Sequence, residues 1–202
     1  LNLAKGGRSS KSYAAEGHWQ AVLRERPDYV LIQFGHNDAP GKGPERETDP
    51  ATTYRENLSR YVDEARAAGA TPVLVTSLTR RYYTPEGRIR SDLEAYAKAV
   101  REVARSRNVP LIDLHARSVE LLDRLGPEAG LALGTLKSDR SLDKTHLNER
   151  GSALFGELVA DELRRAVPAL ARFVRPATQE AEPKPGRRRR SGSSPSRRGD
   201  TA

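Results

Sequence analysis

The sequence contains no cysteine and no methionine among its 202 residues. Without thiols the chain has no disulfide framework, no cysteine nucleophile and no cysteine-ligated metal. Because methionine is absent and the chain begins at Leu1, we expect the start codon, with any signal peptide, to lie upstream. No run of about eighteen apolar residues occurs, which excludes a membrane-spanning helix in the printed chain.

The basic residues are unevenly distributed along the chain. The formal net charge is +8, but residues 174–202 hold eight Lys and Arg residues against three acidic ones, so residues 1–173 carry only +3. Residues 174–202 are rich in Pro, Gly, Ser and Arg and poor in apolar residues, which predicts a disordered tail. The tail either is simply solvated or makes weak contacts with an anionic polymer.

Short apolar runs alternate with longer amphipathic stretches in residues 1–173. The β-branched runs predict buried parallel strands, and the apolar spacing between them predicts helices. The predicted strands are residues 28–34, 71–77 and 109–114, and the predicted helices are residues 51–68, 90–107 and 148–167. This order predicts one α/β domain of three α/β/α layers with a mostly parallel sheet, in which functional residues gather at the carboxyl ends of strands.

Three polar clusters stand where such a fold places its chemistry. Gly35-His36-Asn37-Asp38 follows the first predicted strand, although these are also ordinary turn residues. Asp143 precedes His146 by three residues, a spacing that lets the carboxylate orient the imidazole as a general base, or that simply reflects a capping Asp beside a surface His.

The third cluster, Gly6-Gly7-Arg8-Ser9-Ser10, follows an apolar stretch at residues 1–4 that we interpret as the end of a strand. Glycines in such a loop expose backbone N–H groups that can hold an oxyanion, or they serve a turn that needs positive φ.

Taken in their order along the chain, the three clusters resemble the blocks of the SGNH (GDSL-type) hydrolase family, over roughly residues 1 to 170. More narrowly they resemble its rhamnogalacturonan acetylesterase branch. The segments that carry this likeness are Gly7-Arg8-Ser9, Ser12-Tyr13, Glu16-Gly17 and Phe34-Gly35-His36-Asn37-Asp38. The resemblance implies the flavodoxin-like SGNH fold and hydrolysis of an acyl ester.

The resemblance also implies roles for individual residues. The side-chain amide of Asn37 and the backbone N–H of Gly7 would form the oxyanion hole. His146 would be the general base and Asp143 would orient it. His36 is expected to shape the site, because no second His or carboxylate at metal spacing accompanies it, and neither a metal nor another cofactor is required.

One element of the family pattern is missing, because the chain contains no G-D-S block with the nucleophilic serine. The family carries that block on its first strand, ahead of the segment that begins at Leu1. We therefore expect a domain truncated at its N-terminus that lacks the first strand, and a fragment that is inactive alone. Ser9 follows Gly7 but lacks the G-x-S-x-G elbow of a nucleophile.

The loop at residues 80–89 leaves the second predicted strand and is expected to border the cleft. Arg80, Arg81 and Tyr82 offer guanidinium groups and an aromatic face, which suit uronic carboxylates and sugar rings, unless this is an ordinary exposed loop.

These features favour a monomeric serine esterase that removes acetyl groups from an acylated polysaccharide or oligosaccharide such as rhamnogalacturonan or pectin. Analogy with polymer-degrading family members favours export. Two alternatives remain. One is a lipase or thioesterase acting on acyl chains, and the other is a non-catalytic binding module with a basic tail.

Overall fold

A computed structural model describes residues 1–174 and contains the expected parallel sheet. Its strands β1 (Tyr29–Gln33), β2 (Thr71–Val75) and β3 (Leu111–Ile112) are hydrogen-bonded in the order β1-β2-β3. Val30 pairs with Pro72, and Val75 pairs with Ile112. All three predicted strands are present, each shorter than its apolar run. β1 forms one edge of the sheet.

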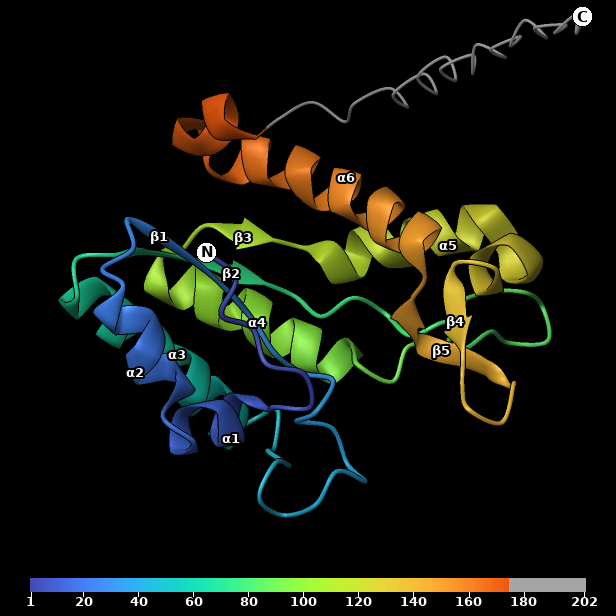
Figure 1. The fold of residues 1–202 in the computed structure, drawn as a ribbon, viewed down its shortest axis with the longest axis horizontal. Coiled ribbons are helices and arrows are strands. Elements are labelled where there is room, and N and C mark those ends of the chain that lie inside the picture. The colour runs from blue at the N-terminus through green and yellow to red at the C-terminus, as the bar shows by residue number, and fades with distance from the viewer. Residues whose placement is uncertain (175–202) are drawn as a thin grey trace, which may run out of the picture.

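Helices cover both faces of this sheet, as Figure 1 shows. One face packs against α3 (Thr53–Ala67) and α4 (Glu94–Arg107), and the other packs against α6 (Glu149–Ala166). Alternation along β2 divides the two cores, because Leu74 joins the α3 and α4 side while Val73 joins the α6 side. The prediction of three layers around a mostly parallel sheet is confirmed.

Helices α3 and α4 are followed by residues that adopt a positive φ. Gly69, with φ +84°, lies just beyond α3, and Asn108, with φ +49°, caps α4 in the left-handed conformation. Both residue types tolerate the positive φ that ends a helix.

Several elements were not predicted from the sequence. They are α1 (Ser10–Ala15), α2 (His18–Arg24), α5 (Leu114–Leu131), the antiparallel hairpin of β4 (Gly134–Leu136) and β5 (Leu142–Leu147), and the 3-10 helix η1 (Pro168–Phe173). Helices α1 and α2 are too short to show a clear helical spacing of apolar residues, and that spacing is interrupted in α5. Gly17, with φ +76°, separates α1 from α2, and α5 kinks at Gly126 before Pro127.

One prediction about the first residues was wrong. Residues 1–4 have no regular structure, although they lie along the outer edge of β1. No strand within residues 1–174 pairs with them, and an apolar stretch without a hydrogen-bonding neighbour does not become a strand. Within residues 1–174 no helix is long and apolar enough to cross a membrane. The predicted tail, apart from Val174, lies outside the described residues.

Candidate active site

The buried carboxylate of Asp38 joins the cluster at residues 35–38 to the cluster at residues 6–10. It accepts hydrogen bonds from the Ser10 backbone N–H (3.0 Å) and hydroxyl (2.5 Å), from the Gly35 N–H (3.0 Å) and from the Thr48 hydroxyl (2.9 Å). Burial raises the pKa of Asp38, while the hydrogen bonds from Ser10 and Thr48 act in the opposite direction. Asp38 therefore fixes the loop before α1 to the carboxyl end of β1.

The same junction depends on close packing at Gly35. Its φ is +132°, and a Cβ there would overlap the Ser77 hydroxyl, which donates a 2.6 Å hydrogen bond to the Phe34 carbonyl. Tyr61 reinforces the junction from α3, because its hydroxyl donates to the Ser10 carbonyl at 2.7 Å. Only glycine fits between β1 and β2 at this point.

Asn37 and the Gly7 loop lie side by side as a result. The Asn37 side-chain amide donates to the Arg8 carbonyl at 3.4 Å, and Gly7, with φ +77°, precedes that residue in an exposed turn. The structure thus brings together the two expected oxyanion donors at the end of β1.

Asp143 and His146 form a close pair on the β4–β5 hairpin. Asp143 Oδ2 lies 2.7 Å from His146 Nδ1, and Asp143 Oδ1 accepts from the backbone N–H groups of Thr145 (2.7 Å) and His146 (2.9 Å). The His146 side chain is 78% exposed and that of Asp143 only 15%. Burial raises the pKa of Asp143, but the hydrogen bonds from His146 and Thr145 outweigh it and hold the pKa well below its usual range. A carboxylate holds Nδ1 of a largely exposed ring and leaves Nε2 as the nitrogen that can act as a general base.

A buried arginine holds this hairpin from behind. Arg81 is fully buried, and its Nη2 donates to the carbonyls of Asp143 and His146, each at 2.7 Å. Its backbone N–H donates to the Lys144 carbonyl at 2.9 Å. Gly134 makes room for this contact, because a Cβ there would lie 2.5 Å from the Asp143 carbonyl and 2.6 Å from Arg81 Nη2.

Arg80 ties the loop after β2 to the Asn37 side of the site. Its guanidinium pairs with Asp92 at 2.6 Å and donates to the His36 carbonyl at 3.0 Å. Burial, and then the charge of Arg80, lower the pKa of His36 to about 4, and the charge of His146 contributes in the same direction. His36 is therefore a neutral, partly buried neighbour of His146 at neutral pH, consistent with its expected role in shaping the site.

The three side chains expected to contact substrate have different environments. Arg80 and Arg81 are buried and bound to other parts of the protein, whereas the ring of Tyr82 is partly exposed. Lys144 and Arg90, which the sequence analysis did not single out, lie over this ring, with Lys144 Nζ at 5.4 Å and Arg90 Cζ at 6.0 Å from its centroid.

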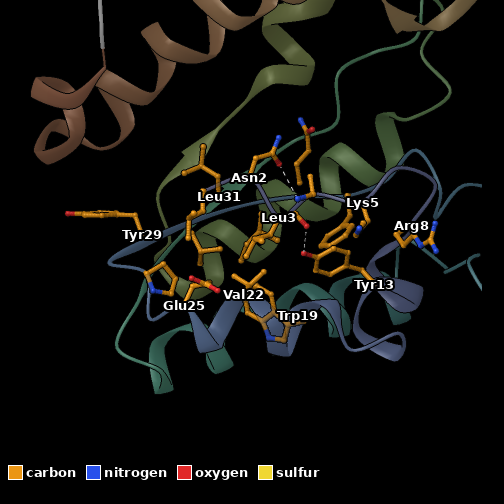
Figure 2. Close-up of a pocket in the computed structure, with 17 residues that line it drawn as sticks. Asn2, Leu3, Lys5, Arg8, Tyr13, Trp19, Val22, Glu25, Tyr29 and Leu31 are labelled. Atoms are coloured by element: carbon orange, nitrogen blue, oxygen red, sulfur yellow. Dashed lines mark hydrogen bonds between the residues drawn. The ribbon is translucent and has the colours of Figure 1, made fainter.

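An apolar groove of about 630 Å³ runs along the open edge of β1. Figure 2 shows side chains from residues 1–5, from α2 and from β1 around it. Leu31 in the middle of β1 is 45% exposed and Leu3 is 37% exposed, while Tyr13 ties residues 1–5 to α1 through a 2.8 Å hydrogen bond to the Leu3 carbonyl. β1 thus has an apolar side chain exposed beside its unpaired edge.

Sequence comparison identifies the family. Residues 1–154 match the model of the GDSL-like lipase/acylhydrolase family. The chain belongs to this family. It is 38% identical over 170 residues to rhamnogalacturonan acetylesterase RhgT of Bacillus subtilis, a match that covers 79% of this chain and 72% of the relative. It is 29% identical over 187 residues to a rhamnogalacturonan acetylesterase of Emericella nidulans, covering 82% of this chain and 72% of the relative. The resemblance inferred from the sequence is confirmed.

Solved structures agree with this assignment. Protein YxiM of Bacillus subtilis superimposes with a TM-score of 0.69 at 27% identity, over 81% of this chain and 45% of that structure. This chain therefore spans less than half the length of that neighbour. An acetylxylan esterase from Geobacillus stearothermophilus superimposes with a TM-score of 0.58 at 21% identity, over 78% of this chain and 68% of the other, which shows a shared fold.

Sequence reasoning missed the residues that hold the site together. Asp38 was recognised as part of the first cluster but not as its anchor, and Arg81 was expected at the surface. Arginine is almost never fully buried unless paired, so its residue type gave no signal of burial. The signal for Asp38 was the serine and threonine content of residues 9–12 and 48, which supplies donors for a buried carboxylate.

Proposed function

We propose that this chain forms most of a serine esterase that removes acetyl groups from a carbohydrate. The observation that carries the proposal is the 2.7 Å contact of Asp143 with His146 Nδ1, which leaves Nε2 on an exposed ring. His146 takes the proton of a serine hydroxyl as that oxygen attacks the acetyl carbonyl, and Asp143 stabilises the imidazolium. The imidazolium gives this proton to the sugar oxygen as the bond between that oxygen and the acetyl carbonyl breaks, which leaves an acyl-enzyme and a free sugar hydroxyl. The neutral His146 then activates the water that releases acetate from the acyl-enzyme.

The donors beside β1 complete this mechanism. The amide of Asn37 and the backbone N–H of Gly7 stabilise the negative charge that develops on the carbonyl oxygen, since they lie in adjacent loops fixed by Asp38. Loss of one such donor typically lowers the rate by about 10²–10³-fold.

The serines near this site are already engaged. Ser9 and Ser12 form a reciprocal capping box at the start of α1, and Ser10 binds Asp38, and all three are buried. We therefore place the nucleophile on a segment outside the printed sequence. The groove beside β1 supports this placement, because an extended segment there would cover Leu31 and pair with the open strand edge.

The substrate proposal rests on the relatives. Three relatives carry the name rhamnogalacturonan acetylesterase, one of them as a probable assignment, so an acetylated glycan such as rhamnogalacturonan or pectin is the proposed substrate. A long-chain lipase is not favoured, since none of Asn37, Asp143 and His146 lines the apolar groove. No step of the proposed reaction needs a cofactor.

The direct test is His146→Ala in the complete gene product, assayed by acetate release from acetylated rhamnogalacturonan. We expect kcat to fall by at least about 10³-fold, because the nucleophile loses its base. His18→Ala is the matched control, because His18 lies on α2 and contacts Glu16 rather than the site. Activity of the His146 variant within a few-fold of wild type would refute the mechanism. Faster hydrolysis of octanoyl than of acetyl esters would instead support the lipase alternative.

A further inference from the structure

Two cations share the ring of Tyr82 beside the proposed catalytic pair. Lys144 Nζ lies 5.4 Å and Arg90 Cζ 6.0 Å from the ring centroid, and both residues are exposed. An aromatic face attracts a single cation, but two cations on one ring repel one another in the absence of an anion. This arrangement creates local positive potential at the surface.

Three nearby arginines pair with carboxylates of the protein, whereas Lys144 and Arg90 do not among the residues that the structure describes. Arg80 pairs with Asp92, Arg88 with Asp123 and Arg101 with Asp113, at 2.6 to 2.8 Å. Across residues 1–174, neither Lys144 nor Arg90 pairs with a carboxylate of the chain. Their charges are therefore available to a carboxylate from outside.

The backbone holds both cations close to His146. Lys144 lies between Asp143 and His146 on β5, and its carbonyl accepts from the backbone N–H of Arg81 at 2.9 Å. The Arg90 backbone N–H donates to the Tyr82 carbonyl at 2.8 Å, which fixes the two ends of the loop together. Lys144 and His146 are both exposed and two residues apart on one strand, a spacing of about 7 Å along the backbone.

We propose that Lys144 and Arg90, gathered on Tyr82, bind the carboxylate of a uronic acid residue next to the acetylated sugar. This inference rests on the proposed function and adds the residues that select an acidic over a neutral glycan. Arg90 offers a planar fork of donors to the carboxylate, and Lys144 offers a point charge beside the catalytic pair. Arg80 and Arg81, the cations that the sequence suggested, act inside the protein instead.

The test compares two forms of one substrate in the complete gene product. Acetylated oligogalacturonides are supplied with free carboxylates or as fully methyl-esterified chains, and only acetate release is measured. The wild-type enzyme should show a higher kcat/KM on the free acid. Lys144→Gln and Arg90→Gln should each reduce the ratio of the two kcat/KM values by about fivefold, and the double variant by at least about tenfold, chiefly through KM.

Arg88→Gln is the matched control, since it removes the same charge from an exposed position of the same loop whose cation already pairs with Asp123. This control should leave the ratio unchanged. Raising the salt from 0.05 to 0.5 M should reduce the wild-type ratio toward that of the double variant, because exposed charges are screened.

Two results would overturn the inference. One is a wild-type ratio near one, and the other is an equal ratio in wild type and the double variant while acetate release continues. Failure of the proposed function would differ from both, because no acetate would then be released from either form of the substrate.

Discussion

Asp38→Asn is the substitution that most sharply tests how the site is assembled. The change keeps the shape of the side chain but replaces one acceptor oxygen with an NH₂ group. Every group that faces the Asp38 carboxylate is a donor, namely the Ser10 N–H and hydroxyl, the Gly35 N–H and the Thr48 hydroxyl. Whichever way the Asn amide is oriented, its NH₂ group must face at least one of these donors.

The cost can be worked out from these contacts. If the Asn oxygen takes the position that faces Ser10 and Thr48, the NH₂ group faces the Gly35 N–H, which then loses its partner in a buried environment. An unpaired buried donor costs about 1–3 kcal/mol, and the remaining bonds lose the charge of their acceptor. Relief from burying a charge offsets part of this. We expect the free energy of unfolding to fall by about 2–4 kcal/mol.

Urea unfolding of the wild type and the variant at pH 7 measures this change. Asp28→Asn is the matched control, because Asp28 is exposed, and it should change stability by less than about 0.5 kcal/mol. In the same variant kcat should fall by about 10²-fold, since the Gly7 loop loses its fixed position relative to Asn37. An Asp38 variant as stable and active as wild type would refute this explanation of the site.

Two further substitutions probe the site from other directions. Gly134→Ala should destabilise the fold by about 1–3 kcal/mol in urea unfolding, because its Cβ would meet the Asp143 carbonyl and Arg81 Nη2. Gly156→Ala, at an exposed position of α6, is the control and should stabilise the fold by about 0.5–1 kcal/mol. Equal effects of the two substitutions would contradict the close packing at Gly134. The pKa of His36 is lowered from its ordinary value of 6.5 to about 4. As the pH falls, His36 is therefore protonated in the unfolded chain before it is protonated in the folded one, and the free energy of unfolding should fall by up to about 3 kcal/mol between pH 6.5 and pH 4. His36→Gln should remove this part of the pH dependence of stability. Parallel curves of stability against pH for the variant and the wild type would show that His36 contributes nothing to that dependence.

The elements that could be predicted from the sequence are those with a clear pattern of apolar residues, either a continuous run or helical spacing. The runs that became β1 and β2 are continuous apolar segments, and α4 carries buried residues at helical spacing from Tyr96 to Ala104. The β4–β5 hairpin escaped prediction because Leu142–Leu147 is partly exposed along its length and contains the polar residues of the site. The residue types of Leu142–Leu147 suit the proposed site rather than the burial of an apolar face.

One part of the candidate site could be predicted from the sequence and another part could not. Asp143 and His146 are close in sequence, so their spacing alone predicted a contact that the structure shows at 2.7 Å. The role of Arg81 could not be predicted, because its two carbonyl partners are 62 and 65 residues away and depend on how the hairpin folds against the loop that follows β2. Long-range contacts of a buried charge follow from tertiary packing, which local residue patterns do not specify.

Labelling the complete gene product with a fluorophosphonate tests whether His146 activates a serine, because the reagent attacks only an activated serine. Mass spectrometry of the labelled peptide identifies that serine. We expect a single labelled serine outside the 202 printed residues, with labelling lost in His146→Ala and retained in His18→Ala. A label on Ser9, Ser10 or Ser12, or labelling that does not depend on His146, would contradict this expectation.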